Sequence, residues 1–316
     1  MEITISVGSM SDDLVVRSSD IPVLMGLDST EDAWWADEIK RYRSAIIKPP
    51  AEYISIAFTE MGLTRERLNQ DIDVAVKETR AFSYKRYLED EARFHSEVFK
   101  QLTRQRELPG TIMTAIVKPI VGDHSFPLLN EQEMALRIGD LAGEFVGKIF
   151  PYVYQLCLST TQSRRSRAGQ EFELVIEQIL KIYGYSYEAQ SNVGAARFQE
   201  LDLAKAVDFL VPSTDAYLSN RPKCAVITAK TTLRERWQQV AEELQRTNVP
   251  AIYLLTLDEK ITDSVVKNLT KYNITLVVPG GQKDAKFSHI DQVLSFESFF
   301  VHDLPHVLAY WKTEEN

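Results

Sequence analysis

Short apolar segments alternate with amphipathic segments along the second half of this 316-residue chain. The apolar segments are short and bounded by polar or turn-forming residues, as strands are, whereas the segments between them repeat their apolar residues with helical spacing. Strands that alternate with helices build a sheet covered on both faces. We therefore predict an α/β fold with a mixed sheet flanked by helices. The predicted strands are 206–211, 224–229, 251–257 and 274–279, and the predicted helices are 170–183, 233–246 and 261–272.

The first 160 residues have mainly helical patterning. One apolar and β-branched run, 111–121, is predicted to be a strand interrupted near Pro119. The chain is thus expected to have two parts, a mainly helical N-terminal part over residues 1–160 and an α/β part over residues 161–316. The predicted helices of the N-terminal part are 33–46, 60–76, 79–106 and 130–150.

Composition argues against several classes of protein. The two cysteines, Cys157 and Cys224, are too few for a disulfide framework or a CxxC zinc site, and they favour a cytoplasmic setting. We expect no signal peptide, because the start of the sequence lacks a basic region followed by an apolar run, and no membrane segment, because no apolar run approaches about 18 residues. The net charge of −9 argues against non-specific coating of DNA, but it is compatible with an acidic surface around one basic groove.

Two charged residues lie where a buried sheet favours apolar side chains. Asp208 lies within the first predicted strand and Lys230 directly follows the second, while Glu173 and Glu243 lie on the helices before and after them. A charge in a strand is costly unless it is paired or binds a metal. In phosphodiester hydrolysis, carboxylates hold Mg²⁺, which activates water, and a lysine orients the water or neutralises the transition state. These four residues are therefore a candidate Mg²⁺-dependent phosphodiesterase site.

The spacing before Lys230 departs from the common nuclease pattern. In the pattern (D/E)-X-K the acid stands two residues before the lysine, and here that position holds Thr228. Thr228 and Lys230 point to the same face, because strand side chains alternate. A carboxylate from the following helix, Glu243 or its neighbour Glu242, can fill the gap. The pattern alone leaves a second interpretation open, in which an edge-strand charge pair and a solvated helix face have no catalytic role.

The start of the predicted helix 233–246 carries residues suited to reading bases. Arg234, Glu235 and Arg236 are expected to project from its first turn. Arginine makes bidentate hydrogen bonds to guanine O6 and N7, and glutamate accepts from cytosine N4. The triplet can therefore read adjacent G·C pairs in the major groove; a salt-bridged surface turn is the alternative.

These residues together resemble a known family. The run KTTLRERW from Lys230 to Trp237, the spacing from Asp208 to Lys230 and on to Glu243, and Glu173 upstream are similar to the type II restriction endonucleases of the CCGG/CCNGG group. That group includes SsoII, PspGI and the C-terminal domain of EcoRII, and the similarity is strongest to its SsoII-like CCNGG branch. The resemblance covers about residues 162–243 and implies the PD-(D/E)XK restriction-endonuclease-like fold. In this family the second acid comes from the following helix, which accounts for Thr228.

The resemblance implies roles for individual residues. The implied catalytic residues are Asp208, Lys230, Glu243 and Glu173, of which Asp208, Glu243 and Glu173 are the implied ligands of Mg²⁺. The implied readers of the CC:GG pairs are Arg234, Glu235 and Arg236. The basic segment 162–167 is expected to lie just before the helix 170–183 and to contact DNA, with Gln162 in the minor groove near the centre of the site and Arg165 also on the DNA.

The resemblance also implies an activity, which is Mg²⁺-dependent cleavage of both strands of duplex DNA at a CCNGG-containing site, with 5′-phosphate ends and flipped central nucleotides. The implied assembly is a homodimer in which each subunit cuts one strand. Residues 1–160 would serve dimerisation and DNA contacts, including flanking pairs as in a PfoI-like TCCNGGA site, and residues 161–316 would hold the catalytic and base-reading core. The alternatives are a repair or recombination nuclease on the same scaffold and a non-catalytic DNA-binding protein.

Overall fold

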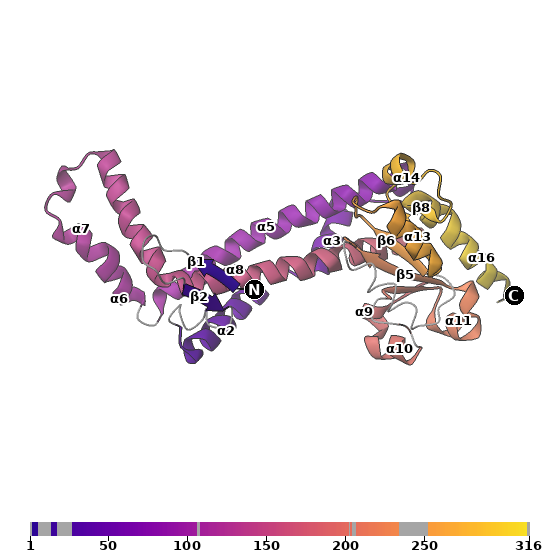
Figure 1. Ribbon diagram of the computed structural model, residues 1–316, viewed down its shortest axis with the longest axis horizontal. Helices are drawn as coiled ribbons and strands as arrows, with labels where there is room; N and C mark the ends of the chain where they lie inside the picture. The colour runs from indigo at the N-terminus through magenta and orange to yellow at the C-terminus, as the bar shows by residue number, and fades with distance from the viewer. Residues whose placement is uncertain are drawn as a thin grey trace. The chain divides into compact units, whose positions relative to one another are not determined.

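The chain divides into two compact units. Unit 1 comprises Met1–Lys48 and Tyr87–Arg164, and unit 2 comprises Pro49–Arg86 and Arg165–Asn316. The helices α5 (Ile72–Arg104) and α8 (Glu131–Tyr183) each contribute to both units (Figure 1). The predicted boundary at residue 160 lies close to the change of unit within α8, but residues 49–86, which the prediction gave to the N-terminal part, belong to unit 2. The structure, a computed structural model, describes residues 2–5, 14–17, 27–105, 108–201, 203, 207–233 and 252–314.

Unit 2 contains a mixed sheet of six described strands in the order β3-β4-β5-β6-β7-β8. The pairs β3–β4 and β4–β5 are antiparallel, whereas β5, β6, β7 and β8 run parallel to one another. The prediction of a mixed sheet is therefore confirmed, and β4, β5, β6 and β7 correspond to the four predicted strands. The strands are β3 Glu188–Ala189, β4 Phe209–Val211, β5 Ala225–Lys230, β6 Ile252–Thr256, β7 Ile274–Val278 and β8 Val293–Ser295.

Alternate residues of the central strands enter two hydrophobic cores, one on each face of the sheet. On β5, Ile227 belongs to the first core and Val226 to the second, as expected from the two-residue period of a strand. Helices cover both cores, which confirms the predicted flanking helices. The helical segments in the described part of unit 2, besides α5 and α8, are α3 Pro50–Glu60, α4 Arg65–Gln70, α9 Gln190–Val193, α10 Ala195–Glu200, α11 Thr214–Ser219, η3 Arg221–Lys223, α13 Asp263–Lys271, α14 Gly280–Lys286, α15 Phe296–Ser298, η5 Phe299–Asp303 and α16 Leu304–Glu314.

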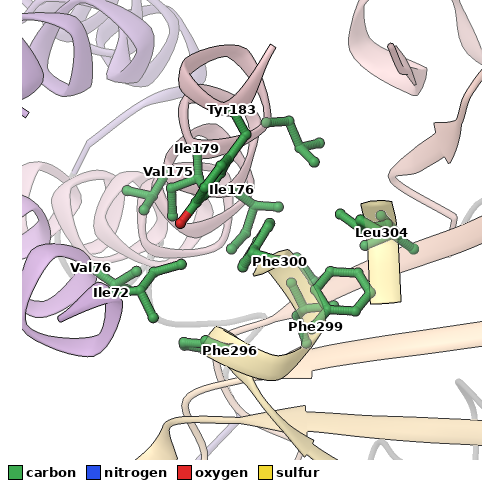
Figure 2. Close-up of a cluster of buried hydrophobic side chains, with 14 of the residues drawn as sticks. Ile72, Val76, Val175, Ile176, Ile179, Tyr183, Phe296, Phe299, Phe300 and Leu304 are labelled. Carbon is green, nitrogen blue, oxygen red and sulfur yellow. The ribbon is translucent and has the colours of Figure 1, made fainter. Parts of the chain in front are cut away.

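The first core holds the C-terminal part of α8 against the sheet. Figure 2 shows side chains of α8 such as Ile176 meeting Phe300 of η5, with Ile72 of α5 at the same cluster. These side chains are essentially removed from water, and burial of each stabilises the fold by roughly 1.5–3 kcal/mol. The same segment of α8 carries Glu173, so this packing fixes the position of that carboxylate relative to the sheet.

Asp73 connects α5 to the start of α14, which follows the C-terminal end of β7. Its carboxylate accepts a hydrogen bond from the backbone N–H of Gly280, the first residue of α14. A Cβ placed on Gly280 would lie 3.2 Å from Asp73 Oδ2, which is closer than an ordinary contact. The absence of a side chain at Gly280 therefore allows the carboxylate to reach the backbone.

Unit 1 is held together by contacts of α2 with α5 and α8. Asp28 caps α2, because its carboxylate accepts from the backbone N–H groups of Thr30 and Glu31 at 2.8 Å. The indole N–H of the buried Trp35 donates to the carbonyl of Tyr152 at 2.9 Å. The elements of unit 1, besides α5 and α8, are β1 Glu2–Ile5, β2 Leu14–Arg17, α2 Ser29–Ile46, α6 Leu108–Ile112, η1 Met113–Val117, α7 Lys118–Gly122 and η2 Phe126–Leu128.

The predicted strand 111–121 is wrong, because α6, η1 and α7 make this run helical. β-Branched residues favour a strand only where neighbouring strands provide hydrogen-bonding partners, and the described neighbours of this run are helical. Pro119 lies where the π-helical segment η1 passes into α7.

The predicted helices 130–150 and 170–183 are parts of one helix, α8, which continues through Pro151. The segment 162–167 therefore lies inside a helix, and the prediction that it precedes a helix N-terminus is wrong. Between Pro151 and residue 170 the sequence contains one glycine, Gly169, and no further proline, so nothing there stops the helix from propagating. Within the described residues, no helix is long and apolar enough to cross a membrane.

Candidate active site

Asp208 and Lys230 meet where β4 and β5 lie side by side. The backbone N–H of Asp208 donates to the carbonyl of Ile227 at 2.9 Å, which fixes Asp208 just before β4 in the antiparallel register. Lys230 ends β5, and its Nζ lies 2.9 Å from Asp208 Oδ2. The same carboxylate oxygen accepts from the backbone N–H of Ala229 at 2.7 Å and from the hydroxyl of Thr228 at 3.2 Å. Asp208 is therefore held by three neighbours on one strand.

Glu173 approaches the same lysine from α8. Its Oε1 lies 3.8 Å from Lys230 Nζ, so the ammonium is in contact with two carboxylates. Of the three side chains, Asp208 is 10% exposed, Lys230 29% and Glu173 36%. The cluster is thus open to solvent at Glu173 and closed at Asp208.

Burial has the largest effect on the pKa of both acids. It raises the pKa of Asp208, and the charge of Lys230 and the N–H of Ala229 offset this effect only in part. Burial also raises the pKa of Glu173, to about 7, with a further increase from the negative charge of Asp208 and a decrease from Lys230. Both carboxylates therefore lack sufficient positive charge around them, and an additional cation between them would favour their ionised forms.

The donors fit a divalent metal ion with oxygen ligands. Asp208 and Glu173 supply carboxylate oxygens, the ligands that Mg²⁺ prefers in proteins. The described residues contain no group of three or more His, Cys, Asp or Glu side chains that could hold a metal. The described part of the site thus offers two acidic residues. Glu243, the third expected ligand, lies outside the described residues, as does its neighbour Glu242.

The segment that follows Lys230 is held by hydrogen bonds to two neighbouring parts of the chain. The hydroxyl of Thr231 donates to the carbonyl of Ala168 on α8 at 3.1 Å. The backbone N–H of the buried Leu233 donates to Asp258 Oδ2 at 2.8 Å. Asp258 follows β6 and is itself buried, and its other oxygen accepts from the backbone N–H of Lys260 at 2.9 Å. The sequence interpretation missed Asp258, although an acid directly after an apolar strand, next to the strand that ends in Lys230, was a usable signal.

The residues expected to contact DNA are described only in part. Gln162 and Arg165 are exposed on α8. Two other arginines of the basic segment have partners within the chain, since Arg164 pairs with Glu91 and the guanidinium of Arg167 lies 5.3 Å from the ring centre of Tyr53. The expected base readers Arg234, Glu235 and Arg236 lie outside the described residues.

The mixed sheet, its covering helices and the lysine between two carboxylates define a protein with a restriction-endonuclease-like α/β fold. The family follows from a direct match. The family model described as EcoRII C terminal matches residues 129–300, more than half of the chain, and the chain belongs to this family.

Individual relatives support both statements. The type II restriction enzyme SsoII of Shigella sonnei is 39% identical over 158 residues, which cover 50% of this chain and 52% of that enzyme, so the match spans about half of the relative's length. The structure resembles metal-depleted Ecl18kI in complex with uncleaved DNA, with a TM-score of 0.70 and 25% identity over 88% of this chain and 85% of that one. The PspGI–substrate DNA complex shares the fold, with a TM-score of 0.58 and 17% identity over 84% of this chain and 94% of that one.

Proposed function

We propose that this chain is a type II restriction endonuclease that hydrolyses both strands of duplex DNA at a specific site with the aid of Mg²⁺. The observation that carries the proposal is the position of Lys230 Nζ, 2.9 Å from Asp208 and 3.8 Å from Glu173, beside a sheet of restriction-endonuclease type. Membership of the EcoRII C-terminal family and the similarity to SsoII add to it.

Each described residue of the cluster has a distinct task. Asp208 and Glu173, together with Glu243, would hold Mg²⁺, which supplies an activated water and positive charge beside the scissile phosphate. Asp208 is fixed by the Ala229 N–H and the Thr228 hydroxyl, so that its carboxylate keeps one orientation. The Lys230 ammonium donates hydrogen bonds, and it orients the attacking water and neutralises charge that develops on the phosphate oxygens. Water attacks phosphorus, the bond from phosphorus to the 3′ oxygen breaks, and the products carry a 5′-phosphate and a 3′-hydroxyl.

Recognition is assigned to the residues around this cluster. Arg234, Glu235 and Arg236 follow directly after the segment anchored by Leu233 and are suited to reading the CC:GG pairs of a CCNGG site. Gln162 and Arg165 are exposed on the helix that also carries Glu173, and they are assigned to the DNA surface. The complex with DNA contains two copies of the chain, one for each strand, with the central nucleotides flipped out. TCCNGGA is the proposed site if the first 160 residues read the flanking pairs.

The test is digestion of three matched plasmids that carry TCCNGGA, a CCNGG site in another context, or neither, with and without Mg²⁺. Run-off sequencing of the ends gives the site and the cut position. We expect discrete fragments only with Mg²⁺ and only from the plasmids with a site. Random nicks or smears would favour a repair nuclease, and no cleavage of any plasmid would favour a non-catalytic DNA-binding protein.

Variants separate chemistry from binding. Lys230→Ala and Asp208→Ala should abolish cutting and retain specific DNA binding, whereas Lys267→Ala, on the exposed side of α13, should cut like the wild type. Full cutting activity in Lys230→Ala or Asp208→Ala would contradict the assigned roles.

A further inference from the structure

Glu177 is a buried carboxylate on α8 that has no task in the proposed chemistry. Its neighbours on the helix, Ile176 and Leu180, belong to the first hydrophobic core, so an apolar side chain would suit this part of α8. A buried charge is costly unless it is paired and hydrogen-bonded. The presence of an acid at this position therefore requires an explanation other than packing.

Among the described residues, three side chains donate to the Glu177 carboxylate, and all three reach the same oxygen, Oε1. Lys181 Nζ and the hydroxyl of Tyr187 each lie 2.9 Å from it, and the amide nitrogen of Asn192 lies 3.2 Å from it. Burial acts to raise the pKa of Glu177, but these hydrogen bonds outweigh it and hold the pKa below its ordinary value. The carboxylate is therefore ionised at neutral pH and attracts all three donors.

The three donors differ in what they connect. Lys181 lies one turn further along α8, so its hydrogen bond stays within that helix. Tyr187 directly precedes β3 and Asn192 lies on α9, so their hydrogen bonds join α8 to the segment 187–192. Glu177 thus holds this segment close to both of its ends.

The middle of the segment 187–192 holds Asp208. The backbone N–H of Gln190 donates to the carbonyl of Asp208 at 2.9 Å. The N–H of Asp208 donates to the carbonyl of Ile227 on β5, also at 2.9 Å, so both backbone polar groups of Asp208 have partners. The position of Asp208 relative to α8 therefore depends on the segment that Glu177 holds.

Glu173, the second acid of the site, lies on α8 one turn before Glu177. Residues four apart project from the same face of a helix. A displacement of the segment 187–192 from α8 would therefore change the separation of Glu173 and Asp208. Mg²⁺ demands near-ideal geometry, with ligands at about 2.0–2.1 Å, so it tolerates little change of this kind.

We propose that Glu177 is a positioning residue for the metal site, which sets the separation of Glu173 and Asp208 through the segment 187–192. This role rests on the proposed function, in which both acids bind Mg²⁺. Glu177 acts through Tyr187 and Asn192, and it keeps the two carboxylates near the arrangement that one ion requires before the ion arrives.

The test compares two variants that each remove one donor from Glu177. Tyr187→Phe keeps the ring but loses a link between α8 and the segment 187–192, whereas Lys181→Met loses a hydrogen bond within the helix. Both donors lie 2.9 Å from the same oxygen, so both variants should be less stable than the wild type without metal. The measurement is the rise in Tm of the full chain with Mg²⁺ alone, without DNA, whose dependence on concentration gives the dissociation constant for Mg²⁺.

Tyr187→Phe should bind Mg²⁺ about tenfold more weakly, the lower end of the loss that follows when residues that orient metal ligands are changed. Lys181→Met should bind Mg²⁺ at least as tightly as the wild type, because it removes a positive charge near the site. Asn192→Ala should also weaken binding, and since Asn192 is exposed this variant leaves the core intact. In plasmid digestion Tyr187→Phe should need more Mg²⁺ but cut at nearly the wild-type rate once Mg²⁺ is saturating.

Equal dissociation constants for Mg²⁺ in Tyr187→Phe, Asn192→Ala and the wild type would overturn the proposal. So would an equal weakening in Tyr187→Phe and Lys181→Met, or a wild type whose Tm does not respond to Mg²⁺. Circular dichroism confirms that each variant is folded. If Mg²⁺ binding changes as expected but the wild type cuts no plasmid, the positioning role stands and the proposed nuclease is rejected, so the two failures are distinguishable.

Discussion

Replacement of Glu173 by glutamine should stabilise the metal-free protein, but only at a pH at which the carboxyl is ionised. Burial and the charge of Asp208 raise the pKa of Glu173 to about 7 in the folded state, although Lys230 lowers it in part, whereas 4.5 is the ordinary value expected in the unfolded chain. The folded state therefore binds the proton more tightly, and its stability falls as the pH rises from 4.5 through about 7. Glutamine cannot ionise, so this loss disappears.

The size of the gain follows from the two pKa values. Their difference corresponds to roughly 3 kcal/mol, at about 1.36 kcal/mol for each pKa unit. The Glu173 side chain is 36% exposed, so water and salt screen much of this energy. We therefore expect a gain of about 1–2 kcal/mol in the free energy of unfolding at alkaline pH. For a chain of this size the gain raises Tm by about 1.5–3 °C.

Thermal unfolding in EDTA, at mildly acidic and at alkaline pH, measures the effect. Glu177→Gln is the matched control, because Glu177 lies one turn further along α8, where its side chain is buried. Burial acts to raise its pKa, but hydrogen bonds from Lys181, Tyr187 and Asn192 hold it below the usual value. The ionised Glu177 therefore stabilises the folded state above the pKa that it has in the unfolded chain, and this stabilisation is lost as the pH falls. Glu177→Gln should accordingly lower Tm at alkaline pH. A Glu173→Gln variant with the wild-type Tm at alkaline pH, or with an equal gain in acid, would refute the reasoning.

Two further predictions concern backbone hydrogen bonds to the carboxylates of the half-buried Asp73 and the buried Asp258. Gly280→Ala should destabilise the protein by about 1–2 kcal/mol in urea unfolding, because its Cβ would lie 3.2 Å from Asp73 Oδ2 and displace that carboxylate. Gly281→Ala has free space and should be close to neutral, and equal effects of the two variants would contradict the assignment. Asp258→Ala should lower the free energy of unfolding by about 1–3 kcal/mol, since the Leu233 N–H loses its acceptor. The variant should also be less selective, so that the ratio of cleavage at the proper site to cleavage at sites with one changed base falls. Unchanged stability and selectivity would show that Asp258 does not position this segment.

The sequence pattern selected Asp208 and Lys230, which the structure brings into contact, because the pattern that marks them is local. A charged residue at the end of an apolar, β-branched strand identified Lys230, and a second one in the preceding strand identified Asp208. Two-residue alternation also placed Thr228 on the same face as Lys230, and the structure has both side chains on the Asp208 carboxylate. The antiparallel register that brings Asp208 beside β5 is a pairing between distant segments, and no pattern within either segment specifies it.

The errors arose where local patterns compete with tertiary context. The run 111–121 has the composition of a strand, but its described neighbours are helices, and it is helical too. The predicted helix 130–150 stops just before Pro151, yet α8 continues through this proline to Tyr183. The position of Asp258 directly after an apolar strand is visible in the sequence, but its hydrogen-bonding partner Leu233, 25 residues earlier in the chain, is not.

The contacts of Lys230 determine how its substitution has to be interpreted. Its ammonium contacts Asp208 and Glu173, and both acids are already disfavoured in their ionised forms by burial. Loss of the ammonium would leave two partly buried carboxylates that repel each other, so the variant would hold a different charge at its centre before any DNA arrives. A loss of cutting in Lys230→Ala thus has two physical sources, the missing donor to water and phosphate and the altered state of the acids. Unfolding in EDTA, without substrate, responds only to the second source, and comparison with the cleavage rate separates the two.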